Sequence, residues 1–268
     1  MGLALLVIIW FITLTSSYFF VVQKWSLPPL ASVNGAPIDA QFVTTYVAMG
    51  IVFLAAQLSL GYFVWRYRAR ANHKATYIHG NTRMEIIWTT LTAILFIWLN
   101  LSGSRIWAES RFQGASPGAL QVEVSGVQFQ WYFRYPGTDG KFAHTGLQFL
   151  DASAGNEAAV GIDTSDPASK DDFVVGTMVL PVDREVDLTL RAQDVIHSFF
   201  IPAMRFKQDA VPGLLIHMHF TPNKIGDYDI ACAELCGLGH YRMKAKLRVV
   251  SQEDFATWQA GRLAEKQQ

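Results

Sequence analysis

The chain has 268 residues, 51% of them hydrophobic, and a positive mean hydropathy of +0.19. This is too apolar for an ordinary soluble domain and indicates a protein that lies partly in a membrane. The formal net charge is +0, which gives no indication of a nucleic-acid partner. Both cysteines lie in one short segment, so they cannot form a disulfide framework, and the sequence has no C-x-x-C-H haem-attachment motif.

Three apolar stretches predict transmembrane helices. Residues 2–22 and 42–65 contain no charged side chain, and a third run begins at residue 86 and continues to Ile106. Each is close to the roughly 20 residues that a helix needs to cross the hydrocarbon core. Aromatic residues at the ends of these runs are typical of interfacial anchors: Trp25, Tyr62, Trp65 and Trp107.

The first apolar stretch has an alternative interpretation as a signal peptide. It lacks a basic start and a clear small-x-small cleavage site, which favours a transmembrane helix.

The loop at residues 66–83 carries only basic charges, so the positive-inside rule places it in the cytoplasm of a bacterial-type plasma membrane. The third helix then runs outward, and the chain after residue 108 is expected on the periplasmic side.

The remainder of the chain predicts β-structure. Apolar and polar residues alternate at 120–124, 186–190 and 247–249, as in half-buried strands. Short strands punctuated by proline and glycine are typical of a sandwich or Greek-key barrel. The expected fold class is therefore membrane-anchored all-β, with transmembrane helices followed by a Greek-key β-barrel domain.

This organisation predicts five consecutive parts. They are an N-terminal transmembrane helix (1–24), an extracytoplasmic linker (25–41), a two-helix transmembrane hairpin (42–107), an extracytoplasmic β-domain (108–251) and a C-terminal helix or tail (252–268). Within the β-domain, residues 137–171 are rich in Gly, Ala, Ser and Asp and are expected to form a loop insertion. The insertion and the residue after it are acidic, with Asp139, Asp151, Glu157, Asp163, Asp166, Asp171 and Asp172.

The sharpest chemical signal is the segment C-A-E-L-C-G-L-G-H-Y-R-M at residues 232–243, which is preceded by His197. Thiolate, thioether and imidazole groups suit copper, and zinc rarely recruits a thioether. A single blue-copper site needs only one cysteine, so Cys232 and Cys236 favour a pair of bridged copper ions. Each ion then needs one histidine and one weak ligand, which would be Met243 and a backbone carbonyl. A structural zinc site and a disulfide remain alternatives.

The pattern C-x-E-x-C-x3-H-x2-M, with D-V-I-H-S-F-F at residues 194–200, resembles subunit II of cytochrome c oxidase. K-Q-D-A-V-P-G at 207–213 and H-G-N-T at 79–82 are also similar to this family, and the resemblance extends over residues 40–136 and 172–250. It implies a cupredoxin-like barrel and a binuclear copper A centre. The implied ligands are His197, Cys232, Glu234 (through its carbonyl), Cys236, His240 and Met243.

The resemblance also implies a function. The chain would be a subunit of a proton-translocating haem-copper oxidase of the respiratory chain, with no catalytic residue of its own. It would accept electrons from cytochrome c or a complex-bound donor and pass them to haem in subunit I, where oxygen is reduced. Family members also use the Glu234 position to bind magnesium at the subunit I interface. The motif leaves open a copper A subunit of a nitric oxide reductase, or a membrane-anchored copper carrier.

An aromatic stretch, G-V-Q-F-Q-W-Y-F-R-Y-P at residues 126–136, resembles the electron-accepting segment of the family. Phe129 and Trp131 are expected to take up electrons from the donor, although such residues also occur as core aromatics of a strand. Phe129 replaces the usual tryptophan, and Arg134 replaces a frequent acid and would reverse one charge of the docking face. The acidic insertion could restore that charge, but a solvated loop is the preferred interpretation.

Glu85 opens the third helix, where Thr82-x-x-Glu85 fits the capping-box pattern. The resemblance suggests a second role, because family members place a glutamate here at the mouth of a proton pathway, and a carboxylate suits that place.

His217 and His219 alternate with apolar residues and are expected to be exposed strand residues rather than metal ligands. The same surface position is expected for the remaining histidines His73, His79 and His144.

Overall fold

A computed structural model describes residues 1–22, 27–71, 73–151 and 155–266. The chain divides into two compact units. The first contains Met1–Ser26 and Pro37–Trp107, and the second contains Leu27–Ala36 and Ala108–Gln268. Trp25, which we predict to be an interfacial anchor, lies outside the described residues.

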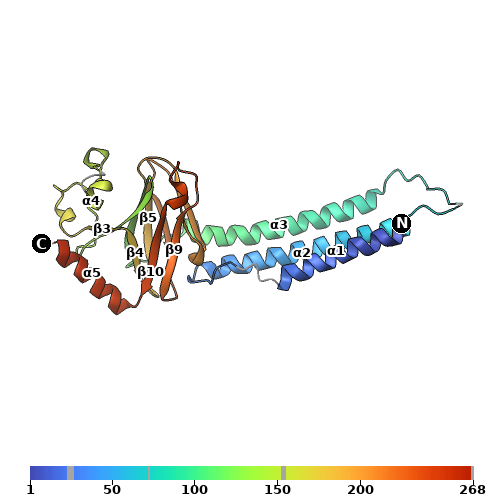
Figure 1. The fold of residues 1–268 in the computed structure, drawn as a ribbon, viewed down its shortest axis with the longest axis horizontal. Helices are drawn as coiled ribbons and strands as arrows, with labels where there is room; N and C mark the ends of the chain where they lie inside the picture. Colours follow the sequence, from blue (N-terminus) through green and yellow to red (C-terminus); the bar gives the residue numbers. More distant parts are fainter. Residues whose placement is uncertain (23–26, 72, 152–154, 267–268) are drawn as a thin grey trace. The chain divides into compact units, whose positions relative to one another are not determined.

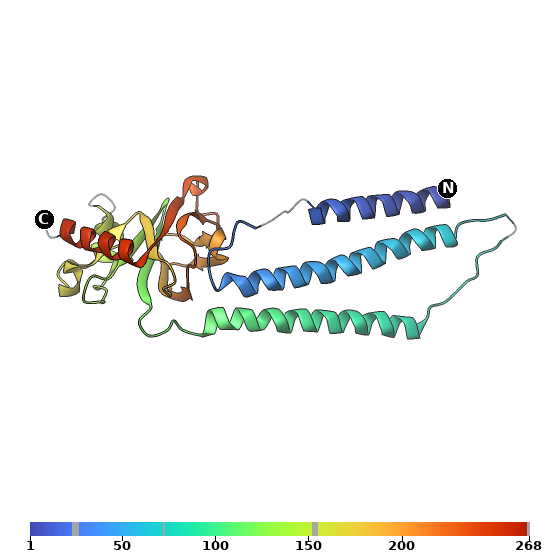
Figure 2. The same ribbon diagram turned by 90° about the horizontal axis from the view of Figure 1, so that it is seen from below.

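The first unit consists of long apolar helices, α1 (Gly2–Val22), α2 (Gly35–Arg66) and α3 (Thr82–Phe112). All three are long and apolar enough to cross a membrane, which confirms the predicted number of spans. Polar contacts join neighbouring helices: Trp10 Nε1 donates to the Leu58 carbonyl at 3.1 Å, and Ser102 Oγ donates to Gln41 Oε1 at 2.7 Å. Figures 1 and 2 show α1 beside α2 and α2 beside α3.

The start of α3 differs from the predicted capping box. Thr82 is already the first helical residue, and Asn81 caps the helix because its Oδ1 accepts from the Met84 N–H at 3.2 Å. Glu85 lies exposed in the first turn, where a negative charge favours the helix dipole. The prediction that Thr82 is the cap is therefore wrong.

The second unit is a two-sheet β-domain (Figure 1), and its buried apolar residues form one core. The first sheet contains, in spatial order, β3 (Phe173–Val175), β2 (Gln130–Tyr135), β1 (Leu120–Val127), β5 (Val186–Ala192) and β8 (Ile216–Phe220). The second contains β4 (Thr177–Pro181), β10 (Lys244–Val250), β9 (Gly226–Cys232), β6 (His197–Ile201) and β7 (Phe206–Ala210). Most neighbouring strands are antiparallel, but β1 runs parallel to β5 and β4 parallel to β10. The predicted fold class, with its cupredoxin-like barrel, is confirmed.

Two segments outside the strands complete the β-domain. Residues 27–36, between α1 and α2, are attached to it, since the Ala31 N–H donates to the Ala203 carbonyl at 2.8 Å and Ser32 Oγ donates to the Met204 carbonyl at 2.7 Å. The C-terminal helix α5 (Gln252–Lys266) buries Phe255 and packs Trp258 edge-on against Tyr135, with ring centres 5.1 Å apart.

The insertion at residues 137–171 is folded against the first sheet rather than free in solvent. It contains the short helices η1 (Leu147–Phe149), α4 (Asn156–Ala159) and η2 (Pro167–Lys170). A small apolar cluster of Ala143, Val160 and Ile162 packs on Tyr132 and Val174 of the sheet. The preferred interpretation of this segment as a solvated loop is therefore wrong for these residues.

Arg134 is buried beneath the insertion and is only 1% exposed. Its Nε donates to Asp172 Oδ2 at 3.1 Å, its Nη2 donates to the Ala143 carbonyl at 2.7 Å, and its Nη1 lies 3.5 Å from Glu123. Arg191 Nε lies 3.7 Å from the same Glu123 oxygen. We call Glu123, Arg134, Asp172 and Arg191 the ionic cluster.

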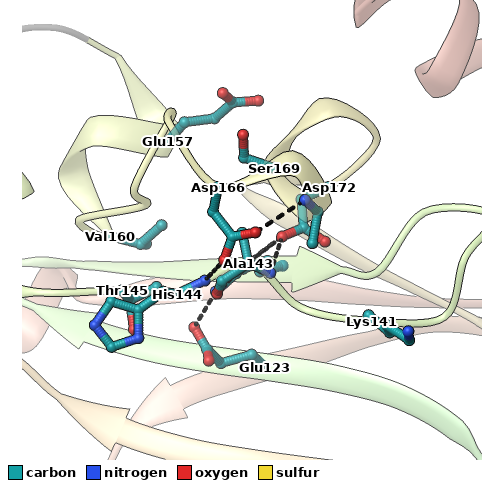
Figure 3. A network of polar contacts seen from close by, with 12 residues as sticks. Glu123, Lys141, Ala143, His144, Thr145, Glu157, Val160, Asp166, Ser169 and Asp172 are labelled. Carbon is teal, nitrogen blue, oxygen red and sulfur yellow. Dashed lines mark hydrogen bonds and ion pairs between the residues drawn. The ribbon is translucent and has the colours of Figure 1, made fainter.

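The ionic cluster corrects the prediction that Arg134 reverses a charge of the docking face. A side chain with its charge paired inside the domain presents none to a partner. Two of the acidic residues also have internal roles, because Asp172 Oδ2 accepts from the Ala143 N–H at 2.8 Å and Asp166 Oδ2 accepts from the His144 N–H at 2.7 Å (Figure 3). The insertion consequently offers fewer free acidic groups than its composition indicates.

Candidate metal centre

The predicted ligands come together at one end of the second sheet. His197 begins β6, Cys232 ends β9, and the loop at residues 233–243 leads into β10. The loop is held to the sheet by its backbone, since the Cys232 N–H donates to the Met243 carbonyl at 3.1 Å and the Ala233 N–H donates to the Ser198 carbonyl at 2.9 Å. The two thiols are therefore presented by the end of a strand and a loop fixed at both ends.

The donor atoms form a chain of short distances. The Sγ atoms of Cys232 and Cys236 are 3.9 Å apart. Cys232 Sγ lies 3.9 Å from His197 Nδ1 and 3.2 Å from the Glu234 carbonyl oxygen. Cys236 Sγ lies 3.6 Å from His240 Nδ1 and 3.8 Å from the thioether sulfur of Met243. Each sulfur thus has one imidazole and one weaker donor on its own side.

Both cysteines are reduced and buried, so the alternative of a disulfide is not supported. A sulfur separation of 3.9 Å is far longer than the roughly 2.05 Å of a disulfide bond. Burial, together with the neighbouring Cys232, raises the pKa of Cys236 to about 11. Without a cation, Cys236 is therefore favoured as the neutral thiol. Positive metal ions would supply the charge that two thiolates need there.

His197 is oriented by a partner that the sequence analysis did not single out. Its Nε2 lies 2.8 Å from Asp194 Oδ1. A carboxylate only accepts hydrogen bonds, so Nε2 carries the hydrogen and Nδ1 is free to bind a metal. Burial raises the pKa of Asp194, but hydrogen bonds from His197 and from the N–H groups of Gln128 and Val195 outweigh this effect and hold it below its usual value. Asp194 was visible only as the first letter of the D-V-I-H motif.

The turn between β1 and β2 forms a second wall of the centre. Gln128 donates through its side chain to the Cys236 carbonyl at 2.6 Å and through its N–H to Asp194 Oδ2, also at 2.6 Å. Gly126 gives His197 and Trp131 room, because a Cβ at this position would lie 3.0 Å from His197 Cδ2 and 2.9 Å from Trp131 Cζ3. Both residues lie in the 126–136 stretch that resembles the electron-accepting segment, but the sequence analysis assigned neither of them to the metal site.

The two aromatic candidates for electron uptake occupy different places. Trp131 is completely buried, with its ring centre 5.8 Å from that of His197, which agrees with the alternative that it is a core aromatic of a strand. Phe129 is half-buried and lies against Gly237 and Gly239 of the 233–243 loop. The guanidinium carbon of Arg242 lies 5.7 Å from the centre of the Phe129 ring. Their roles in electron transfer stay predictions.

The fold and this site together define a membrane-anchored cupredoxin-like protein with a cluster of Cys, His and Met side chains that could hold a metal. Its sequence matches the periplasmic domain of cytochrome c oxidase subunit II at residues 120–250 and the transmembrane domain of the same subunit at residues 23–106. The chain belongs to the cytochrome c oxidase subunit II family.

Individual relatives agree with this assignment. The chain is 32% identical over 258 residues to an alternative cytochrome c oxidase subunit 2 of Bradyrhizobium diazoefficiens, covering 96% of this chain and 91% of the relative. It is 30% identical over 270 residues to cytochrome c oxidase subunit 2 of Thermostichus vulcanus, covering 92% and 82%. A crystal structure of the periplasmic domain of subunit II of cytochrome oxidase from Bradyrhizobium japonicum matches with 31% identity and a TM-score of 0.41, covering 56% of this chain and 99% of that chain.

Family membership makes the chain a subunit of a haem-copper oxidase, from a copper-binding family of oxidoreductase subunits. It is a membrane protein with a periplasmic β-domain, as the sequence analysis predicts. These similarities favour the oxidase over the nitric oxide reductase subunit and the copper carrier that the motif alone left open.

Proposed function

We propose that this chain binds two copper ions between Cys232 and Cys236 and relays electrons through them from a cytochrome c-type donor to haem in subunit I. The observation that carries the proposal is the paired arrangement of donors around two sulfurs 3.9 Å apart. A single metal would leave one half of this set unused. The proposed ligands are His197, Cys232, Glu234 (through its carbonyl), Cys236, His240 and Met243.

The donor chemistry fits copper better than zinc. Two thiols, two imidazoles and a thioether are ligands that suit copper, and Met243 is only 1% exposed with its sulfur directed at Cys236. When bound, a pair of copper ions supplies a redox centre in which one electron is shared. The protein contributes a frame that hardly changes on reduction, because strand ends and loop hydrogen bonds hold the ligands in place.

Orientation of His197 is the clearest contribution of the surrounding residues. Asp194 accepts from its Nε2–H, and Gln128 donates to both Asp194 and the Cys236 carbonyl. These contacts connect the β1–β2 turn, the β5–β6 loop and the 233–243 loop. Partners of metal ligands fix ring orientation and raise ligand basicity, and losing them commonly weakens metal binding.

The surface beside the centre is apolar rather than acidic. Leu235, Leu238 and Tyr241 of the 233–243 loop are 78%, 98% and 78% exposed, and Phe129 lies beneath this loop. We propose Phe129 as the side chain through which electrons arrive from a cytochrome c-type or complex-bound donor. The buried Arg134 leaves the charge of this surface unchanged, so it is no argument against a basic donor.

Two carboxylates have proposed roles away from the copper ions. The carbonyl of Glu234 faces Cys232, while its side chain is exposed. The exposed carboxylate could therefore bind a magnesium ion shared with subunit I. Glu85 is exposed at the start of α3, as a group that collects protons for subunit I would be. The predicted parts 1–24, 25–41, 42–107, 108–251 and 252–268 stay our proposed domain organisation.

Electron paramagnetic resonance of the oxidised oxidase complex tests the proposal, with copper quantified in the same sample. An electron shared by two copper nuclei gives more hyperfine lines than one nucleus can give. Cys232→Ser and Cys236→Ser should each abolish that spectrum and stop electron transfer from the donor. His144→Gln, which changes an exposed histidine of the insertion, is the matched control. A single-copper spectrum or a zinc-loaded centre in the unmodified complex would contradict the proposal.

A further inference from the structure

The outer face of the first sheet carries a second group of histidines. His217 and His219 are two residues apart on the edge strand β8, with Met218 and Phe220 between and after them buried in the core. Side chains alternate between the faces of a strand, so both imidazoles lie on the outer face. The antiparallel register places Asp187 of β5 directly opposite His219. Two imidazoles and one carboxylate therefore share one face of two neighbouring strands.

His219 does not have the exposed position that its sequence pattern predicts. Its side chain is 13% exposed, and its Nδ1 lies 2.8 Å from Glu185 Oε1. Glu185 also accepts from the Ser116 N–H at 3.1 Å and is thereby fixed. Because Glu185 accepts from Nδ1, the lone pair of the neutral ring is on Nε2. That Nε2 is buried and has no hydrogen-bond partner among the described residues, which is unfavourable unless a ligand occupies it.

The neighbouring donors are held in a similar way. His217 Nδ1 lies 3.2 Å from Thr189 Oγ1, and its Nε2 has no hydrogen bond within the described part of the chain. Gln121 Nε2 donates to Asp187 Oδ2 at 2.9 Å, while no described residue donates to Oδ1. Histidines that bind metals usually have the second ring nitrogen bonded to a carboxylate or another polar group. Both His217 and His219 show that arrangement.

A hollow connects these side chains. Its volume is about 380 Å³, and its lining includes Asp187, His217, His219 and the segment 111–115. Arg111 also lines it, but its guanidinium is committed elsewhere: it donates to the Lys207 carbonyl at 3.0 Å, to Gln208, and to the Met218 sulfur. The hollow therefore offers one free carboxylate oxygen and two free imidazole nitrogens to a ligand.

We propose that Asp187, His217 and His219 form a second metal site, separate from the copper centre, for a divalent ion such as zinc. Two imidazoles and a carboxylate are a common zinc-binding set that leaves a fourth position for water. The set contains no sulfur, so it does not favour the copper(I) that the Cys/Met centre suits. The donor atoms of these three residues are not all within 4.8 Å of one another, so at least one of the three side chains must change rotamer when the ion binds.

Zinc binding to the complete, copper-loaded oxidase complex tests this proposal. Equilibrium dialysis with radioactive zinc at neutral pH should show one more high-affinity zinc per complex in the unmodified protein than in His219→Gln. His217→Gln and Asp187→Asn, which change partly or fully exposed side chains, should each weaken that binding at least tenfold. His144→Gln removes an exposed histidine of the insertion and should leave binding unchanged.

Two further measurements separate the possible results. Cobalt in place of zinc should give visible absorption bands that disappear in His219→Gln and persist in His144→Gln. The copper resonance spectrum, recorded on each sample, should stay constant, because the proposed site lies on a different sheet from the copper ligands. Equal zinc binding in the unmodified complex, His217→Gln and His219→Gln would overturn the proposal, whether or not the copper centre behaves as proposed above.

Discussion

The metal centre and the ionic cluster bury polar groups to a similar depth but satisfy them differently. In the metal centre, His197, Cys232 and Cys236 face one another with no positive charge among them. In the ionic cluster, the guanidinium of Arg134 is in contact with two carboxylates and a carbonyl. The first arrangement has no cation of its own, whereas in the second the carboxylates of Glu123 and Asp172 are paired with guanidinium groups of the same chain.

Whether its buried polar groups are paired within the chain distinguishes a ligand-binding site from a structural feature. A buried charge is unfavourable unless it is paired, and pairing within the chain leaves nothing for a ligand to do. A buried cluster of thiol, imidazole and thioether groups with no cation among them indicates a missing metal ion. By this criterion, Arg134 serves to hold the insertion on the sheet, and the cysteine loop has the features expected of the proposed metal site.

The largest expected effect comes from breaking the ionic cluster. Arg134→Met leaves Asp172 buried without its guanidinium partner and Glu123 with Arg191 alone, and should lower the free energy of unfolding by about 3–5 kcal/mol. Chemical denaturation of the complete chain, followed by tryptophan fluorescence, measures this loss. Arg248→Met is the control, because its ion pair with Asp227 is 61% and 62% exposed and should be worth at most about 1 kcal/mol.

A double variant sharpens this result. Arg134→Met combined with Asp172→Leu removes both charges of the closest pair and should recover part of the stability, since an apolar replacement of a buried pair is often tolerated. The copper spectrum should be unchanged in both variants. Loss of copper in Arg134→Met while the domain remains folded would show that the two regions are not independent.

Copper binding should depend on the carboxylate that orients His197. Asp194→Asn keeps the size of the side chain but removes the carboxylate that accepts from His197 Nε2. Copper affinity or electron-transfer rate should fall by roughly 10- to 100-fold, the usual effect of losing the partner of a metal ligand. Competition with a copper chelator measures the affinity, and the exposed Asp227→Asn is the control. An unchanged affinity would mean that the packing around His197 is enough to orient it.

Space beside His197 gives a third test. Gly126→Ala places a Cβ about 3 Å from both His197 and Trp131 and should cost about 1–3 kcal/mol through overpacking. The copper spectrum should shift as well, because the imidazole must move. Gly114→Ala is a suitable control, since no atom lies within 4 Å of the Cβ it would add. A stability loss without a spectral shift would mean that Trp131 moves to make room for the new methyl group while His197 stays in place.

The smallest effect concerns the acidic insertion and its dependence on pH. Hydrogen bonds from the N–H groups of His144 and Ala168 lower the pKa of Asp166. A carboxyl with a lowered pKa in the folded state stabilises the fold above its usual pKa of about 4, and this contribution is lost as the pH falls through the lowered value. Local opening of residues 137–171, measured by hydrogen exchange corrected for the slower intrinsic exchange in acid, should therefore increase at acid pH. Asp166→Asn should show the increase already at neutral pH and respond less to acid.

The helices and the metal loop were predictable because their signals are local. A run of uncharged residues predicts a transmembrane helix whatever surrounds it, and the proposed ligands from Cys232 to Met243 lie close together in the sequence. Alternation predicted strands such as β5, whose Val186, Leu188 and Leu190 are all buried. Composition alone also predicted where the insertion lies in the chain.

Pairing between distant segments was decided only by the tertiary structure. Arg134 meets Asp172 across 38 positions, and Glu123 comes from a third strand, so no local pattern indicated that Arg134 is buried. Trp131 and Phe129 have the same alternation in sequence, yet one faces the core and the other the metal loop. Strand periodicity indicates that two residues share a face, but only packing determines which face is covered. For the same reason the buried Nε2 of His219 could not be inferred from its sequence, because Glu185, which orients it, lies on a neighbouring segment.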